Sequence, residues 1–158
     1  MVTVERMPIP VASGVRDRAR MTNATEQAVF SFLRHRLENQ IPGSQIRYET
    51  TKFSSYDDQT GQTRGTVPDI HITKPDGREI FLEITNSGRG RKARQMAVMN
   101  NFPEVKYVVW GRSQLQHIEK IARKKDPNIK LLPKGGMRTQ SLTSRLPIAP
   151  GTVVQSSK

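Results

Sequence analysis

Two carboxylates at the ends of a predicted β-hairpin are the residues whose types and spacing best suit chemistry. Asp69 lies at the start of one predicted strand, Pro68–Thr73, and Glu83 lies near the end of the next, Glu79–Thr85. The turn sequence Lys74-Pro75-Asp76-Gly77-Arg78 joins the two strands. Because the strands of a hairpin are antiparallel, the start of one lies beside the end of the other. The two carboxylates are therefore expected at the same end of the sheet.

The register of this hairpin decides how close the carboxylates come. A turn centred on Asp76 and Gly77 pairs residues whose numbers sum to about 153, which places Asp69 opposite Glu83 or Ile84. Two carboxylates so close repel each other unless a cation lies between them, and hard oxygen ligands suit Mg²⁺ or Mn²⁺. We therefore predict a metal site formed by Asp69 and Glu83, with the Ile84 carbonyl as a further ligand. The alternative is that Asp69 only ends a turn and that Glu83 is an ordinary exposed strand residue.

Further candidate residues lie on either side of the hairpin. Glu26 is either a third carboxylate of the site or the capping-box partner of Asn23, and it could serve as both. His71 is expected to be a packed or hydrogen-bonded residue and not a ligand. A basic stretch that follows the hairpin is predicted to contact phosphates through Arg89, Arg91, Lys92 and Arg94.

Apolar periodicity predicts the elements that position these residues. A helix is expected from Ala24 to Asn39, with Asn23 as its N-cap. A strand is expected over Gln45–Phe53, and a polar loop over Ser54–Gly65. The segments expected after the hairpin are a helix from about Arg91 to Asn100 with Ala93, Met96 and Ala97 facing inward, a strand over Val105–Trp110, a helix capped by Ser113, and a short strand over Ile129–Leu132.

The chain is expected to form one domain, residues 23–133, with an irregular segment at each end. Residues 1–22 show no periodicity and are interpreted as a flexible basic arm. Residues 134–158 are rich in Gly, Ser, Thr and Pro and are interpreted as a disordered basic tail. The predicted element order is αβββαβαβ, and the fold class is α/β.

This order and several short motifs together resemble the PD-(D/E)XK nuclease superfamily, most of all the phage endonuclease I type of Holliday-junction resolvase. The motifs are Glu26 in the first helix, Thr66-Val67-Pro68-Asp69, Leu82-Glu83-Ile84-Thr85, the basic stretch from Arg89 to Arg94, Asn101-Phe102-Pro103-Glu104-Val105 and Asn128-Ile129-Lys130-Leu131-Leu132-Pro133. The resemblance implies a restriction-endonuclease-like αβββαβ core, in which helices flank a central mixed sheet. It also implies a homodimer, because resolving a junction requires two cuts. Phage head-completion nucleases and transposon end-cleaving nucleases share this core.

The chain departs from the family pattern at one position. Two residues after the motif glutamate the family has a lysine, and this chain has Thr85. That lysine positions or deprotonates the attacking water and offsets charge in the transition state. A threonine can orient a water but carries no charge. Lys92 could supply the charge from the next helix, with Arg91 and Arg94 as alternatives for this electrostatic role, or Lys92 could simply contact a phosphate.

Composition indicates the class of partner. Of the 158 residues 26 are Lys or Arg and 14 are Asp or Glu, so the formal net charge is +12. A surplus of this size favours a polyanionic partner such as nucleic acid. The alternative is a ribosome-associated or merely soluble basic protein, and DNA as the partner is implied by the resemblance. Cysteine is absent, which fits a reducing compartment. No segment predicts a membrane span or a secretory signal, so the expected location is the cytoplasm of a cell, or of the host for a viral protein.

The sequence therefore predicts a metal-dependent DNA endonuclease, with junction resolution as one form of that activity. In this hypothesis Asp69 and Glu83 hold Mg²⁺ or Mn²⁺ and hydrolyse phosphodiesters together with Glu26 and Lys92. The alternative is a nuclease-fold protein with reduced catalysis that binds nucleic acid as a structural component of a ribonucleoprotein or virion.

Overall fold

Two β-sheets and four helices make up a mixed α/β fold. The computed structural model describes residues 1–85 and 89–131, and within the second range it describes side chains from residue 93 onward. The elements are β1 (Val2–Pro8), α1 (Asp17–Arg20), α2 (Ala24–Gln40), β2 (Gln45–Tyr48), β3 (Thr51–Asp57), β4 (Gln62–Thr66), β5 (Ile70–Thr73), β6 (Glu79–Ile84), α3 (Arg89–Met99), β7 (Lys106–Trp110) and α4 (Arg112–Ala122). No helix in these ranges is long and apolar enough to cross a membrane.

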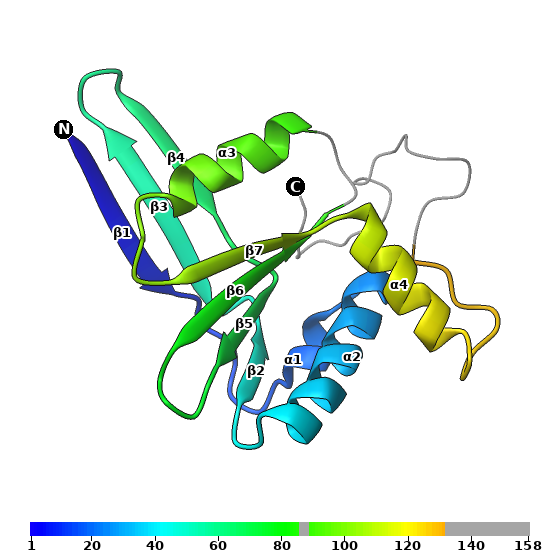
Figure 1. Cartoon of the computed structure of the whole chain (residues 1–158). Helices are drawn as coiled ribbons and strands as arrows, with labels where there is room; N and C mark the ends of the chain where they lie inside the picture. The colour runs from blue at the N-terminus through cyan, green and yellow to red at the C-terminus, as the bar shows by residue number, and fades with distance from the viewer. Residues whose placement is uncertain (86–88, 132–158) are drawn as a thin grey trace.

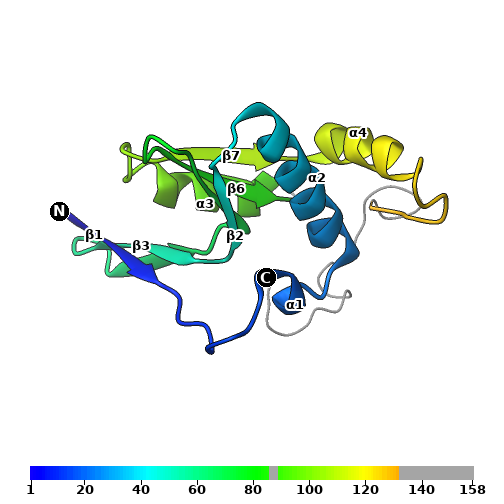
Figure 2. The same cartoon turned by 90° about the horizontal axis from the view of Figure 1, so that it is seen from below.

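The central sheet has four strands in the order β2-β5-β6-β7 (Figure 1). Its first three strands are antiparallel neighbours, whereas β6 and β7 are parallel. The parallel pair requires a crossover between its strands, and α3 lies in that crossover. A second sheet, in the order β1-β3-β4, lies to one side of the first, as both views show (Figures 1 and 2).

Each face of the central sheet is covered by a separate apolar core. On one face α2 and α4 pack against alternate sheet residues, and the buried members include Val29, Phe30, Ile70, Leu82 and Leu115. On the other face α3, the segment that follows it and the second sheet enclose Phe53, Phe81, Val98, Met99, Phe102 and Val105. The rings of Phe53 and Phe81 meet edge to face with centroids 4.9 Å apart. Successive residues of β6 thus enter different cores, because side chains alternate along a strand.

The helix α2 and the β5–β6 hairpin agree closely with the elements predicted from the sequence. Asn23 caps α2 by accepting hydrogen bonds from the backbone N–H groups of Thr25 and Glu26. The hairpin formed by β5 and β6 pairs Ile70 with Leu82, so partner numbers sum to 152, one less than predicted. Both helix and hairpin were predicted from local patterns alone.

Several other expectations are wrong. Residues 1–22 contain a strand and a short helix where a flexible arm was expected, and β1 pairs with β3 from Val2 to Pro8. The expected polar loop Ser54–Gly65 is a second hairpin that pairs Phe53 with Thr66 and Asp57 with Gln62. The expected strand Gln45–Phe53 divides into β2 and β3, because Glu49 between them has a φ of +46°.

The elements after the hairpin also differ in detail. The helix α3 buries Val98 and Met99, whereas Ala93, Met96 and Ala97, expected to face inward, are exposed. Gly111 is the N-cap of α4 in place of Ser113, and its N–H donates to the Gln114 side chain. Ile129 to Leu131 form no strand, although Leu131 is buried and its backbone binds both Thr25 and Glu119. The predicted tail, residues 134–158, lies outside the described residues.

Candidate active site

Three buried carboxylates from three elements lie toward one end of the central sheet. Glu26 is in the first turn of α2, Asp69 directly precedes β5, and Glu83 is in the last part of β6. Their relative exposures are 9%, 6% and 4%, respectively. Acidic residues are rarely so buried unless they are paired or bind a metal. Their burial toward one end of a sheet makes these residues candidates for a functional site.

Asp69 is held where β5 begins and β6 ends. Continuing the observed register by one position places Asp69 opposite Glu83. The Asp69 Oδ2 accepts a hydrogen bond of 2.7 Å from the Ile84 N–H, and the Asp69 carbonyl accepts one of 2.9 Å from the Glu49 N–H. Since the N–H and C=O of one strand residue point toward the same neighbouring strand, the Ile84 carbonyl lies on the Asp69 side of β6. The three groups predicted as metal ligands, namely the two carboxylates and the Ile84 carbonyl, thus come from adjacent positions of the hairpin.

Glu26 contacts Asp69 from the helix side of the sheet. Its Oε1 accepts a hydrogen bond of 2.9 Å from the Tyr48 hydroxyl, and its carboxyl group shares a hydrogen bond with Asp69. Burial raises the pKa of Glu26 well above its ordinary value, and the neighbouring charges of Asp69 and Glu49 raise this pKa further. Two carboxyl groups in contact share a proton readily, because two ionised carboxylates repel each other. A bound cation would remove this cost. The Glu26 side chain binds Tyr48 and Asp69, so its position serves the carboxylate cluster and not a capping box.

Glu83 is oriented by the helix that follows it. It lies on the same face of β6 as Phe81, and its Oε2 accepts a hydrogen bond of 3.1 Å from the Gln95 amide of α3. Thr85, which replaces the family lysine, follows the end of β6, and its N–H donates to the Trp110 carbonyl of β7 at 2.9 Å. The ends of β6 and β7 are thereby tied together beside the carboxylates.

The structure brings some predicted site residues together and leaves others undecided. Asp69 is opposite Glu83 and in contact with Glu26. Within residues 1–85 and 89–131, however, no group of three or more His, Cys, Asp or Glu side chains is arranged to hold a metal ion. The side chains of Arg89, Arg91 and Lys92 lie outside the described residues, and Arg94 is exposed on α3.

His71 belongs to a separate cluster and not to the carboxylate site, in agreement with the sequence expectation. Its Nε2 lies 2.8 Å from Glu79 Oε2, its Nδ1 lies 2.6 Å from Thr50 Oγ1, and its ring stacks on Phe81. Burial lowers the pKa of His71. The Arg6 guanidinium donates two hydrogen bonds to Glu79, at 3.0 and 2.6 Å, and so joins β1 to this cluster.

Sequence reasoning missed three residues that shape the site. Tyr48 and Gln95 bind carboxylates of the site, and the charge of Glu49 acts on Glu26. The strand predicted over Gln45–Phe53 contains Tyr48, but nothing in that segment indicates the partner of the tyrosine. No local pattern marks Gln95, because its contact with Glu83 depends on how α3 packs across the sheet.

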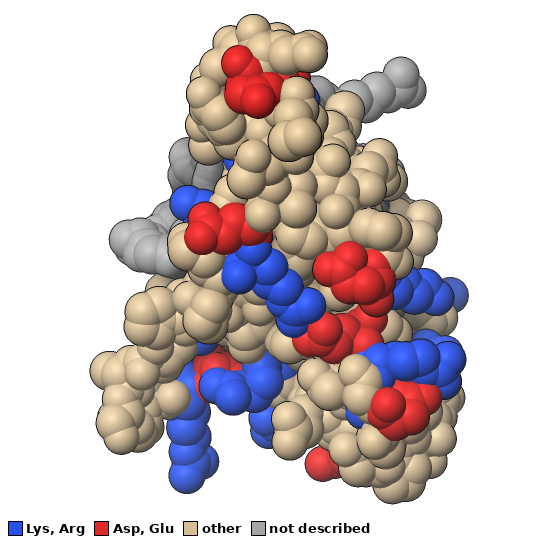
Figure 3. Space-filling view, turned by 90° about the vertical axis from the view of Figure 1, so that its left-hand side faces the viewer, with Lys and Arg blue, Asp and Glu red and all other residues tan. Residues whose placement is uncertain are grey.

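On the face of the molecule shown in Figure 3, acidic and basic side chains lie side by side, so this face carries no continuous basic surface. No protein-family model matches the chain, and neither a curated protein nor a solved structure with significant similarity to it was found.

Proposed function

We propose that this chain is a metal-dependent nuclease that hydrolyses phosphodiester bonds in DNA. The observation that carries the proposal is the burial of Asp69 and Glu83 opposite each other at the end of a sheet, in a chain with a net charge of +12. Burying a carboxylate carries a desolvation cost, and its oxygen atoms are ligands suited to a divalent cation. Functional sites are where such local costs are expected.

The donor set fits a hard divalent cation. Mg²⁺ in nucleic-acid enzymes is commonly bound through one or two carboxylates, with water and substrate phosphate as further ligands. Asp69, Glu83 and the Ile84 carbonyl would supply the oxygen ligands, and a third protein carboxylate is not required. When bound, the cation would polarise a phosphoryl oxygen and lower the pKa of a bound water. Mn²⁺ prefers similar ligands and would bind at the same site in place of Mg²⁺.

The surrounding residues have separate tasks in this proposal. Gln95 holds the Glu83 carboxylate in one orientation, and the Ile84 N–H does the same for Asp69. Glu26, which shares a hydrogen bond with Asp69, would accept or release a proton beside the ligands. Lys92 would supply the positive charge that Thr85 cannot, and Arg89, Arg91 and Arg94 would contact the DNA backbone.

The mixed four-stranded sheet gives the proposal a structural frame. Leaving out the β3–β4 hairpin, the order α2, β2, β5, β6, α3, β7 is αβββαβ. This is the order of the restriction-endonuclease-like core that the sequence resembles. Under this interpretation a homodimer would place two such sites on one branched DNA.

The second candidate is a DNA-binding protein with reduced catalysis, and Thr85 is the observation that favours it. Incubation with supercoiled, linear and four-way-junction DNA in Mg²⁺, Mn²⁺ or EDTA separates the two functions. Cleavage that requires a metal supports the nuclease. Salt-dependent DNA binding without cleavage in any metal would support the binding protein.

A further inference from the structure

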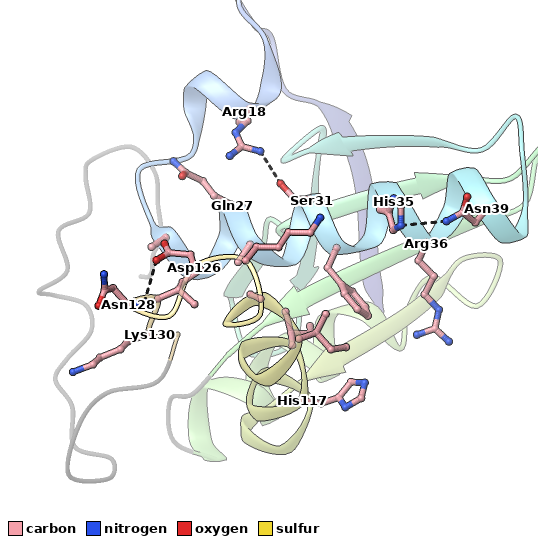
Figure 4. Close-up of a pocket in the computed structure, with 18 of the residues that line it drawn as sticks. Arg18, Gln27, Ser31, His35, Arg36, Asn39, His117, Asp126, Asn128 and Lys130 are labelled. Carbon is pink, nitrogen blue, oxygen red and sulfur yellow. Dashed lines mark hydrogen bonds between the residues drawn. The ribbon is translucent and has the colours of Figure 1, made fainter.

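A groove on the side of the molecule formed by α2 and α4 is not used by the proposed nuclease activity. It has a volume of about 1070 Å³ and runs between the two helices (Figure 4). A second hollow of about 290 Å³ shares Phe32, Arg36, His117 and Ile118 with it and adds Trp110 to the lining. The two hollows therefore form one continuous surface, which we call the α2–α4 groove.

The floor of the α2–α4 groove is apolar. From α2 it includes Ala28 and Phe32, and from α4 it includes Ile118, Ile121 and Ala122. Ile121 is 38% exposed and follows the buried Ile118 by three residues on α4. Large apolar side chains that gather in an exposed hollow are typical of a docking surface for another molecule.

The rim of the groove is basic. Arg18, Arg36, Lys125 and Lys130 line it, and Asp126 is the acidic residue among its lining side chains, so the lining has a net charge of +3 with histidines neutral. Arg18 and Arg36 come from the α2 side, whereas Asp126 and Lys130 come from the segment after α4 (Figure 4). The Arg36 guanidinium lies 6.0 Å from the Phe32 ring centroid, which holds a positive charge directly over the apolar floor.

We propose that the α2–α4 groove binds an acidic amphipathic helix of a partner protein. An apolar strip bordered by positive charge complements a helix with apolar residues at i, i+3 or i+4, and i+7, and with Asp or Glu beside them. The wall formed by α4 has 11 residues and is about 16 Å long, which matches about three turns of a bound helix.

Charge selects this occupant over the alternatives. The chain's own residues 132–158 contain Lys134, Arg138, Arg145 and Lys158 and no acid, so they have the same sign as the rim. A DNA duplex presents phosphates and base edges, which gain nothing from covering an apolar floor. An acidic amphipathic helix is the partner that satisfies both the floor and the rim.

The test uses the full chain and a phage-displayed library of helical peptides. Selected peptides are synthesised, and their affinities are measured by fluorescence anisotropy. We expect selection to enrich peptides with helically spaced apolar residues flanked by Asp and Glu. Ile121→Glu, and separately the double variant Lys125→Glu/Lys130→Glu, should weaken their binding about tenfold or more. Lys120→Glu, on α4 but outside the lining, is the matched control and should change affinity by less than about twofold.

Several results would overturn the proposal. One is a selection that enriches no peptide above an uncoated surface, and another is the enrichment of basic or non-amphipathic peptides. A third is that the selected peptides bind the wild type and both groove variants equally. A loss of duplex DNA binding in Lys125→Glu/Lys130→Glu would assign the groove to nucleic acid instead. If light scattering shows a dimer for the wild type and a monomer for this double variant, the α2–α4 groove would be assigned to a second copy of the chain. Since Lys125 and Lys130 are exposed, the double variant tests the groove even where Ile121→Glu fails to fold. None of these outcomes depends on cleavage, so the proposed nuclease activity stands or fails separately.

Discussion

Glu26 has a charge that opposes folding of the metal-free protein. It is buried beside Asp69, and burial followed by the Asp69 charge raises the pKa of its carboxyl group. For a carboxyl group whose folded-state pKa is raised, the protonated form stabilises the fold at low pH. That contribution is complete below the ordinary pKa of 4.5 and is lost as the pH rises through the raised value.

Glu26→Gln should therefore stabilise the metal-free protein at neutral pH. The Gln oxygen can still accept the Tyr48 hydrogen bond, but the side chain no longer ionises. We expect the free energy of unfolding at pH 7 to rise by about 1 kcal/mol, and the difference from the wild type to disappear near pH 4. Urea unfolding across this pH range measures both. A Glu26→Gln protein that is less stable than the wild type at pH 7 would show that the buried charge is compensated within the protein.

Thr85 and Lys92 decide whether the missing lysine has been replaced from another element. Thr85→Lys would put an ammonium two residues after Glu83, and it should raise metal-dependent cleavage unless Lys92 already supplies the charge. Lys92→Ala should then lower cleavage more than DNA affinity, because an interaction made mainly in the transition state affects rate more than binding. Single-turnover cleavage at saturating DNA separates the two effects. Equal losses in rate and affinity for Lys92→Ala would make this residue a simple phosphate contact.

At the scale of elements, Arg6 links β1 to β6 of the central sheet, in addition to the pairing of β1 with β3. Its guanidinium binds Glu79 and lies 5.5 and 5.3 Å from the ring centroids of Phe53 and Phe81. Arg6→Ala should lower the free energy of unfolding by about 1 kcal/mol, since the pair is partly exposed and solvent screens it. Arg64→Ala is the control, because Arg64 is an exposed arginine of β4 that binds only Gln62 among the described side chains. A loss as large in Arg64→Ala as in Arg6→Ala would contradict the specific role of Arg6.

The same cluster gives the fold a dependence on pH. The hydrogen bond from Arg6 lowers the pKa of Glu79, and burial lowers the pKa of His71. Each of these two groups has a lowered pKa in the folded state. Its contribution to the stability of the fold is therefore present above its ordinary pKa and is lost as the pH falls through the lowered value. We expect wild-type stability to decrease on acidification below about pH 6.5 through His71, and further near pH 4 through Glu79. His71→Gln should remove the upper part of this decrease in thermal melts, and an unchanged profile would contradict it.

Elements were predictable from sequence where their signals were local. The Asn23 cap and the apolar face of Val29, Phe30 and Leu33 predict α2, and the Asp76-Gly77 turn predicts the β5–β6 hairpin. The β3–β4 hairpin was missed because its strands are mostly polar and pair with each other and with β1. Pairing with a distant strand leaves no periodic signal in the segment itself.

The candidate site was predictable to a similar extent. The positions of Asp69 and Glu83 followed from the turn and from strand alternation. The partners Tyr48 and Gln95 did not, because each reaches the site through the packing of another element. The prediction of which α3 residues face inward was wrong for the same reason. The helix buries its last residues, Val98 and Met99, against Phe53 and Phe81, which belong to two different sheets.

At the scale of the whole molecule, the net charge of +12 predicts a strong dependence of DNA binding on salt. Each phosphate contact contributes about 0.9 to the slope of log K against log salt for duplex DNA. Replacing Arg89, Arg91, Lys92 and Arg94 with Ala should therefore lower this slope by up to about 3.6. The matched control replaces four exposed basic residues elsewhere: Arg64, Lys106, Lys120 and Lys124. Equal effects of the two sets would mean that charge acts through its total amount and not through the stretch at α3.

The proposed nuclease activity depends on a divalent metal held by Asp69 and Glu83. The most direct test compares the single-turnover cleavage rates of the wild type and Asp69→Asn on saturating four-way-junction and duplex DNA, with Mg²⁺, Mn²⁺ or EDTA. Asn keeps an acceptor for the Ile84 N–H but removes the charge. We expect metal-dependent cleavage by the wild type, a rate lower by about 10²-fold or more in Asp69→Asn, and little change in DNA affinity. Cleavage by Asp69→Asn at the wild-type rate, or a wild type that is inert in both metals, would contradict it.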